Sequence, residues 1–176
     1  MSVEPKPVQR PHPPVYIGGY SEDTVRWTAA RGYHLIQHGI QSRASVMRSL
    51  RIFGELGGDV HAVPVGRFVY VGESDDAARR EIWPTVLSLT ARLRQVGIHK
   101  STGIISEEEL ESDRFVRDVA IVGGPATCAD KIAALQCEVG LDYLNALSAF
   151  FGYLPPEQLR RSLSLLAREV MPRVGG

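Results

Sequence analysis

The sequence has little cysteine. Two of its 176 residues are cysteines, Cys128 and Cys137, too few for a disulfide framework and at a spacing that matches no zinc motif. We interpret both as small, buried or half-buried apolar side chains on one helix, with Cys128 on its apolar stripe. Unpaired cysteines are typical of a reducing compartment, so we expect a cytoplasmic protein.

The sequence also lacks net charge and long apolar runs. Twenty basic residues balance twenty acidic ones, which gives no electrostatic reason to expect a nucleic acid or an anionic membrane as partner. No apolar run approaches the roughly 18 residues that span a bilayer, and the amino-terminal stretch lacks the apolar segment of a secretory signal. The composition, 44% hydrophobic and 23% charged, is typical of one soluble globular domain.

Prolines divide the chain into a lead-in and a domain. Five of the eleven prolines lie in residues 1–14, which we expect to be extended, and residues 15–176 form the domain. The domain alternates β-rich runs with helical periodicity, which is typical of βαβ units and a parallel sheet. Four strands are predicted, at 15–17, 33–37, 63–71 and 142–148.

Five helices are predicted between and after these strands. Serine caps open the first helix at Ser21, the second at Ser42 or Ser45, and the third at Ser74. Pro84 is expected to kink the third helix or to end its first part. The predicted helical ranges are 21–31, from Ser42 or Ser45 to 57, from about 75 to 93, 125–139 and 155–171.

Residues 97–118 are expected to be polar and irregular, apart from one helix start. In "SEEELES", Ser106 and Glu109 predict a capping box, and we interpret the acidic run as a solvated first helical turn rather than a metal site. A four-stranded parallel sheet with helices on one side would leave two open edges and a bare face. Helices on both sides would instead make a small doubly wound domain, and the sequence leaves both arrangements open.

The stretch "VYIGGYSEDTVRW" is the first candidate site. It predicts a strand, a turn and a helix start, and parallel α/β folds bind ligands at such strand ends. Gly18 and Gly19 let backbone approach a ligand, and Ser21 and Thr24 offer hydroxyl donors to a phosphate. The alternative is simple capping, because Ser21 is a good N-cap and the two acidic residues that follow it already complement the helix dipole.

The second predicted strand carries two histidines. His34 and His38 share one side of it, but an extended chain separates them by roughly 13 Å, too far to share a metal. We therefore expect no metal site there. Gln37 and His38 lie at the carboxyl end of the strand, where they are candidates for lining a pocket.

Two further groups favour structural roles. Glu73, Asp75 and Asp76 follow the third predicted strand, where helix capping is favoured over acid–base catalysis. Aromatic residues follow the last predicted strand, where core packing is favoured over a wall against a planar cofactor. These residues are Phe150, Phe151 and Tyr153.

Four motifs occur in the order and spacing of a known family. The segments "PKPVQRPHPPVYIGGYSEDTVRWTAARGYHLI", "RFVYVGESDDAARR", "VGGPATCADKIAAL" and "LPPEQLRRSLSLLAREVMPRV" resemble the bacterial luciferase-like family. These are flavin-dependent monooxygenases built on a TIM barrel, and the resemblance is weakest across 97–118. It matches the carboxyl-terminal half of that fold, strands five to eight with their helices, and a (βα)₄ half does not close alone.

The resemblance implies bound FMN, or a related deazaflavin as in some branches. Phosphate contacts then fall on the Tyr20 backbone, Ser21 and Thr24, with Gly18 and Gly19 shaping the turn. The catalytic histidine and the basic phosphate clamp usually belong to the absent half, so no catalytic residue is assigned. The substrate cannot be predicted either, because part of the pocket also belongs to the absent half.

The implied activity uses reduced flavin from a separate reductase and O₂ to oxygenate a small organic substrate. It requires a partner that completes the barrel, either a second copy of this chain or an amino-terminal half-barrel chain. The alternative is a non-catalytic half-barrel subunit that acts by association, with weak or no flavin binding. A third hypothesis is that the chain is a small doubly wound nucleotide-binding domain.

Overall fold

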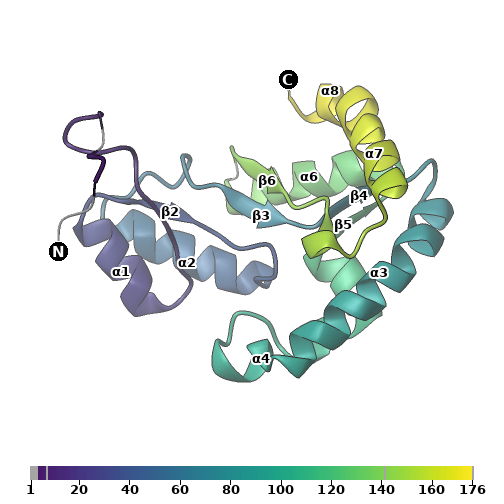
Figure 1. The fold of residues 1–176 in the computed structure, drawn as a ribbon, viewed down its shortest axis with the longest axis horizontal. Coiled ribbons are helices and arrows are strands. Elements are labelled where there is room, and N and C mark those ends of the chain that lie inside the picture. Colours follow the sequence, from purple (N-terminus) through teal and green to yellow (C-terminus); the bar gives the residue numbers. More distant parts are fainter. Residues whose placement is uncertain (1–3, 7, 141, 176) are drawn as a thin grey trace.

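The computed structural model describes residues 4–6, 8–140 and 142–175, shown as a ribbon in Figure 1. Residues 4–6 and 8–14 contain no helix or strand. The strands that follow are short, three residues each: β1 (Tyr16–Gly18), β2 (His34–Ile36), β3 (Val65–Arg67), β4 (Val69–Val71), β5 (Ile121–Gly123) and β6 (Leu144–Ala146).

Helices separate most of the strands, as the alternating pattern predicts. The α-helices are α1 (Glu22–Ala30), α2 (Arg43–Glu55), α3 (Asp75–Gln95), α4 (Ile98–Ser101), α5 (Ser112–Arg114), α6 (Pro125–Val139), α7 (Pro156–Leu165) and α8 (Met171–Val174). Two 3₁₀ turns and two π-helical turns complete them: Glu108–Leu110, Phe150–Gly152, Phe115–Val119 and Leu166–Val170.

The strand pairing is parallel throughout, as the sequence predicts. β1 pairs with β2, and β3 pairs with β6. A parallel bridge between Gln37, just beyond β2, and Val65 joins these two pairs, so the strand order is β1-β2-β3-β6. Four parallel strands therefore lie side by side within the described chain.

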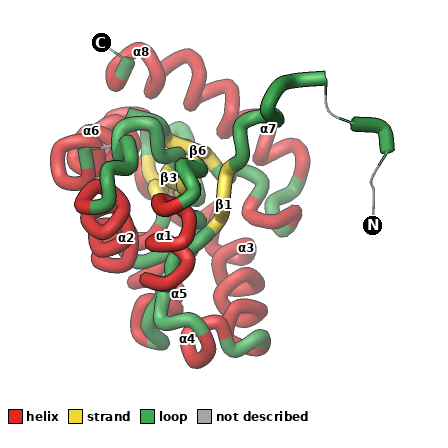
Figure 2. The backbone as a smooth tube through the Cα atoms, turned by 90° about the vertical axis from the view of Figure 1, so that its left-hand side faces the viewer, coloured by secondary structure: helices red, strands yellow, loops and turns green. Residues whose placement is uncertain are grey.

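Helices cover one face of these four strands. Val25 of α1, Phe53 of α2 and Leu135 of α6 pack against Leu35 and Val65 in one buried cluster. Figure 2 shows α1, α2 and α6 together on one side of the strands. On the opposite face the rings of Tyr16 and His34 stack at 4.7 Å, yet both residues are exposed.

The β4–β5 pair has helices on both faces. Phe68 and Tyr70 point into a core formed with α3 and residues 104–122, whereas Val69 and Val71 point toward α6 and the π-helical turn 166–170. This part of the molecule is a closed core, and the four-strand part is open on one side. The structure thus contains both arrangements that the sequence left open, in different places.

Several predicted elements need correction. The expected strand 63–71 is split at Phe68, because β3 pairs with β6 while β4 pairs with β5. β5 was not predicted, and residues 97–118 are largely helical rather than irregular. α3 continues through Pro84, so the expectation that this proline ends the first part of the helix is wrong.

The predicted caps are confirmed. Ser21, Ser42 and Ser74 each accept a hydrogen bond from a backbone N–H three residues later, which identifies Ser42 rather than Ser45 as the cap of α2. Cys128 and Cys137 both lie on α6 as predicted, but only Cys128 is buried, so the expectation of a buried or half-buried side chain is wrong for Cys137. Burial raises the pKa of the Cys128 thiol to about 12, consistent with a structural role.

Candidate functional site

The turn between β1 and α1 presents two hydroxyl groups at the amino end of a helix. Ser21 Oγ accepts a hydrogen bond from the Thr24 backbone N–H at 3.2 Å and lies 2.8 Å from Thr24 Oγ1. Ser21 is exposed and Thr24 is half-buried, just beyond the carboxyl end of β1. Unsatisfied N–H groups and the positive end of the helix dipole favour an anion at such a position.

Space, rather than backbone angle, requires glycine at position 19. A Cβ on Gly19 would lie 2.4 Å from Thr24 Cγ2, whereas a Cβ on Gly18 would lie 3.9 Å from its nearest neighbour, Ile36 Cγ2. Gly19 therefore lets the turn close onto Thr24. Gly18 leaves open space at the end of β1.

The acidic residues of α1 leave the turn accessible to an anion. The Glu22 carboxylate accepts two hydrogen bonds from Arg26, at 2.8 and 2.6 Å, so its charge is compensated along the helix. Asp23 is exposed. Tyr20 is half-buried against the core cluster that contains Phe68, which holds the turn to the rest of the protein. Of the two carboxylates, only Asp23 is therefore left to repel a bound phosphate.

A buried amide connects this turn to the next strand. Gln37 is 1% exposed, and its Nε2 donates to the Gly19 carbonyl at 3.1 Å. Gln41 Nε2 donates to Gln37 Oε1 at 2.7 Å, while Gln41 Oε1 accepts from the His38 backbone N–H at 2.7 Å. The ends of β1 and β2 are therefore held in one hydrogen-bonded network.

His38 lies at the edge of this network. Its Nδ1 accepts from the Ile40 backbone N–H at 3.4 Å, so a neutral ring carries its proton on Nε2. Desolvation by the surrounding protein lowers the pKa of His38 and favours that neutral form. The His38 ring lies 5.7 Å from the ring of Phe151, between centroids, and so the ends of β2 and β6 meet.

The segment after β6 has unusual backbone geometry. Phe150 and Phe151 have φ angles of 48° and 55°, in the left-handed region that costs a residue with a Cβ roughly 1–2 kcal/mol. Phe150 is fully buried, whereas Phe151 is 53% exposed and edge-on to Phe68. Burial of Phe150 fixes the turn, which then holds the Phe151 ring outward beside His38. Such strain clusters at functional sites.

The predicted site residues are only partly brought together. Gly18, Gly19, Ser21 and Thr24 form the β1 turn, and hydrogen bonds link that turn to the end of β2. His34 lies at the start of β2, where its ring stacks on that of Tyr16, and His38 lies beyond the end of the same strand. The aromatic group divides, since Phe150 is core and Phe151 lines the strand ends.

Ser74 and Asp75, which follow β4, cap the amino ends of two helices. Ser74 caps α3, and Asp75 accepts hydrogen bonds from the Gly124 backbone N–H at 2.6 Å and from the Thr127 hydroxyl at 2.9 Å. These bonds lower the pKa of Asp75, the Gly124 bond most. Asp75 therefore joins the amino ends of α3 and α6, a role beyond the predicted capping of its own helix.

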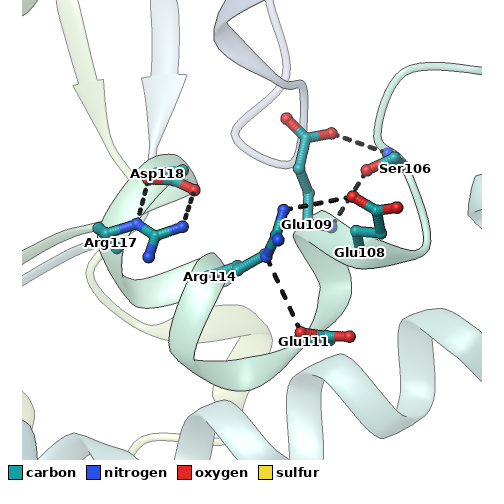
Figure 3. Close-up of polar contacts among 7 residues, drawn as sticks. All are labelled: Ser106, Glu108, Glu109, Glu111, Arg114, Arg117 and Asp118. Atoms are coloured by element: carbon teal, nitrogen blue, oxygen red, sulfur yellow. Dashed lines mark hydrogen bonds and ion pairs between the residues drawn. The ribbon is translucent and has the colours of Figure 1, made fainter.

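The acidic run in 106–118 forms ion pairs on the surface (Figure 3). Ser106 and Glu109 make the predicted capping box, with the two backbone N–H groups donating at 2.8 and 3.1 Å. Arg114 contacts Glu108 at 3.2 Å and Glu111 at 3.9 Å. Within the described residues, no group of three or more His, Cys, Asp or Glu side chains is placed to hold a metal ion.

Two buried polar residues were not predicted from the sequence. Gln41 is fully buried although it belongs to a polar stretch before α2, and its bond to Gln37 ties it to the turn after β1. Arg67, the last residue of β3, is 3% exposed and donates to the Gly66 carbonyl at 2.8 Å. Desolvation, and secondly the charge of Arg43, lower the pKa of Arg67 to about 10. The position of this arginine within an otherwise apolar predicted strand is the sequence feature that could have indicated its burial.

A family model of luciferase-like monooxygenases matches residues 1–142. The chain belongs to the luciferase-like monooxygenase family. No curated protein matches it significantly. None of the helices in the described ranges has the length and apolar character needed to cross a membrane.

Solved structures share the fold at low sequence identity. The oxygenating constituent of 3,6-diketocamphane monooxygenase from Pseudomonas putida, a type II Baeyer–Villiger enzyme in complex with FMN, has a TM-score of 0.71 and 20% identity, over 93% of this chain and 49% of that one. A monooxygenase from Streptomyces bottropensis has a TM-score of 0.72 and 21% identity, over 96% of this chain and 50% of that one.

A third similar structure uses a different cofactor. The coenzyme F420-dependent tetrahydromethanopterin reductase from Methanopyrus kandleri has a TM-score of 0.59 and 15% identity, over 92% of this chain and 51% of that one. The chain thus spans about half the length of the three solved structures.

Proposed function

We propose that this chain is the flavin-phosphate-binding half of a luciferase-like, FMN-dependent monooxygenase. The observation that carries the proposal is the β1–α1 turn. It offers the Ser21 and Thr24 hydroxyls and the amino end of α1 on one exposed surface, while Glu22 is engaged by Arg26. These donors fit a phosphate. The family match and the FMN complex of the Pseudomonas putida enzyme favour FMN over a deazaflavin.

Bound reduced flavin would supply the reaction with O₂ that oxygenates a small organic substrate. The residues of this chain would bind and orient. Ser21 and Thr24 would hold the phosphate, and Gln37 would keep the turn in register with β2 through the Gly19 carbonyl. His38 and Phe151 would border the space above the strand ends, where His38 presents an N–H donor.

Activity would require a partner that supplies four more strands. A closed barrel of this class has eight parallel strands, and the described chain aligns four, with one face bare. The partner is either a second copy of this chain or an amino-terminal half-barrel chain. The bare face also supports the second candidate function, a non-catalytic half-barrel subunit with weak or no flavin binding.

Flavin titration separates these functions. We expect the purified chain, alone or with its partner, to bind FMN stoichiometrically by absorbance, and riboflavin more weakly. A protein that takes up no FMN in its assembled form would contradict the oxygenase proposal and favour the non-catalytic subunit.

Two variants test the phosphate contact. Replacing Ser21 and Thr24 together by alanine should weaken FMN binding by roughly 10²- to 10⁴-fold, because each hydrogen bond to a charged group contributes about 1.5–3 kcal/mol, and should weaken riboflavin binding much less. Ser21→Asp is the matched variant, since aspartate keeps the N-cap but repels a phosphate. Equal weakening of FMN and riboflavin would contradict the assignment.

A further inference from the structure

Two strands of the parallel sheet have an open edge in the described chain. Val65 N–H donates to the Tyr143 carbonyl and Leu147 N–H donates to the Arg67 carbonyl, so odd-numbered residues of this segment face β3. By alternation, Leu144 and Ala146 direct their N–H groups to the other side of β6. Open edges of this kind bind further strands.

The opposite edge of the sheet has the matching polarity. His34 N–H donates to the Val15 carbonyl, so Tyr16 and Gly18 direct their backbone groups away from β2. β1 and β6 run parallel within one sheet, with their carboxyl ends on the same side. The β1 edge of one copy can therefore pair in parallel with the β6 edge of another.

An apolar cavity lies beside the β6 edge. It has a volume of about 260 Å³, and α6, β6 and the carboxyl-terminal helical segment supply its walls. Its apolar lining includes Ile132, Leu144, Leu166, Val170 and Val174. A strand added to β6 would direct alternate side chains toward this cavity.

β1 carries a side chain suited to that cavity. Ile17 pairs in register with Leu35, which points into the helix-covered core, so Ile17 lies on the same face of the sheet. Ile17 is half-buried, since no strand covers its outer side among the described residues. Each chain therefore carries both an open β6 edge beside this cavity and an open β1 edge with an apolar side chain on the matching face, so we take the occupant to be a second copy.

We propose that two copies of this chain close one eight-stranded barrel about a two-fold axis, with β6 of each copy paired to β1 of the other. The inference rests on the barrel fold in the proposed function. Closure places the exposed Tyr16–His34 stack inside the barrel. The chain has a formal net charge of zero, so two copies do not repel each other through net charge.

The pairing makes each site a product of two chains. The β1 turn with Ser21 then lies beside the end of β6 of the other copy, which leads to the turn that carries Phe151. Each dimer has two equivalent sites of this kind, because a two-fold contact repeats itself. The β1 turn is thus incomplete as a site without the second copy.

The mass of the chain in solution, measured without flavin, tests the pairing. We expect twice the mass of one chain by light scattering and sedimentation. The Ala146 N–H points to the open edge and makes no bond to β3, so Ala146→Pro should remove it and leave a monomer that circular dichroism shows to be folded. Ala146→Val keeps the N–H and should remain a dimer. A wild-type monomer, or an Ala146→Pro protein that stays dimeric, would overturn the proposal.

A mixing experiment distinguishes this pairing from other dimers. Tyr16→Pro blocks the other edge, so it should also be monomeric alone. A mixture of Ala146→Pro and Tyr16→Pro chains retains one intact β6–β1 junction and should regain dimer, whereas a dimer that joins like edges would not.

The mass results and the FMN titration are independent readouts. A dimer that binds no FMN would overturn the proposed function only, and an FMN-binding monomer would overturn the pairing only. A chain that gains mass only with a separate amino-terminal half would also overturn the pairing.

Discussion

Gln37 Nε2 lies 3.1 Å from the Gly19 carbonyl oxygen, across 18 residues of sequence, and this bond joins the two strand ends of the candidate site. The same side chain accepts from Gln41, so it has partners on both sides of a fully buried position. An apolar residue at this position would leave the Gly19 carbonyl and the Gln41 amide without their partner.

We therefore expect Gln37→Leu to lower the free energy of unfolding by about 1–3 kcal/mol. Urea denaturation measures the change. Gln95→Leu, at the exposed end of α3, is the control and should stay within about 0.5 kcal/mol of the wild type. Equal effects of the two variants would show that the buried network contributes nothing measurable.

Gly19→Ala should destabilise the protein by about 1–3 kcal/mol, because its methyl group would overlap the Thr24 side chain. Gly18→Ala adds the same methyl group one residue earlier, where the nearest atom is 3.9 Å away, and should have little effect. Thermal unfolding of both variants gives the comparison. A larger loss for Gly18→Ala would contradict the packing described for this turn.

The two consecutive phenylalanines after β6 should respond in opposite ways. Phe150→Ala removes a fully buried ring and should cost about 3–5 kcal/mol. Phe151→Gly relieves the left-handed backbone while it removes an exposed ring, so its net effect should stay within about 1 kcal/mol. Urea denaturation tests both, and a similar loss in the two variants would refute the division of roles.

His38 should make the folded protein sensitive to acid. Its pKa in the folded state is below the ordinary 6.5, so the unfolded chain binds more protons as pH falls through that value. Stability contributed by neutral His38 is present above pH 6.5 and is lost as pH falls toward the lowered pKa. His38→Asn keeps an acceptor for the Ile40 N–H without titrating, and should show a smaller loss of stability between pH 7 and pH 5 in urea denaturation.

Asp75→Ala should cost about 1–2 kcal/mol at pH 7, since two hydrogen bonds to the start of α6 are lost. Asp76→Ala removes a neighbouring carboxylate in the same helical turn and should cost only a few tenths of a kcal/mol. The pKa of Asp75 is lowered from 3.8, so its contribution is present above pH 3.8 and is lost as pH falls through the lowered value. The difference between the variants should therefore vanish in strong acid.

Local patterns made much of this fold predictable. Serine caps depend on neighbouring residues, and Ser21, Ser42 and Ser74 occupy the expected places. The split of 63–71 at Phe68 was not predictable in this way, because it depends on two partner strands that are distant in sequence.

The sequence allowed us to predict which residues form the candidate site, but not which of them contact one another. The turn with Ser21 and Thr24 follows from a strand, two glycines and a cap. The network of Gln37 and Gln41, and the meeting of His38 with Phe151, depend on how separate strand ends come together. The helices in 97–118 are held by buried Leu110 and Phe115 rather than by local periodicity.

The β4–β5 pair, covered by helices on both faces, gives this chain a core of its own. Its buried side chains come from Ile40 and from residues 68 to 170, all within one copy. Assembly of the proposed dimer therefore need not be coupled to folding. If two preformed copies meet as rigid bodies, their association should follow second-order kinetics without a large gain in helical signal.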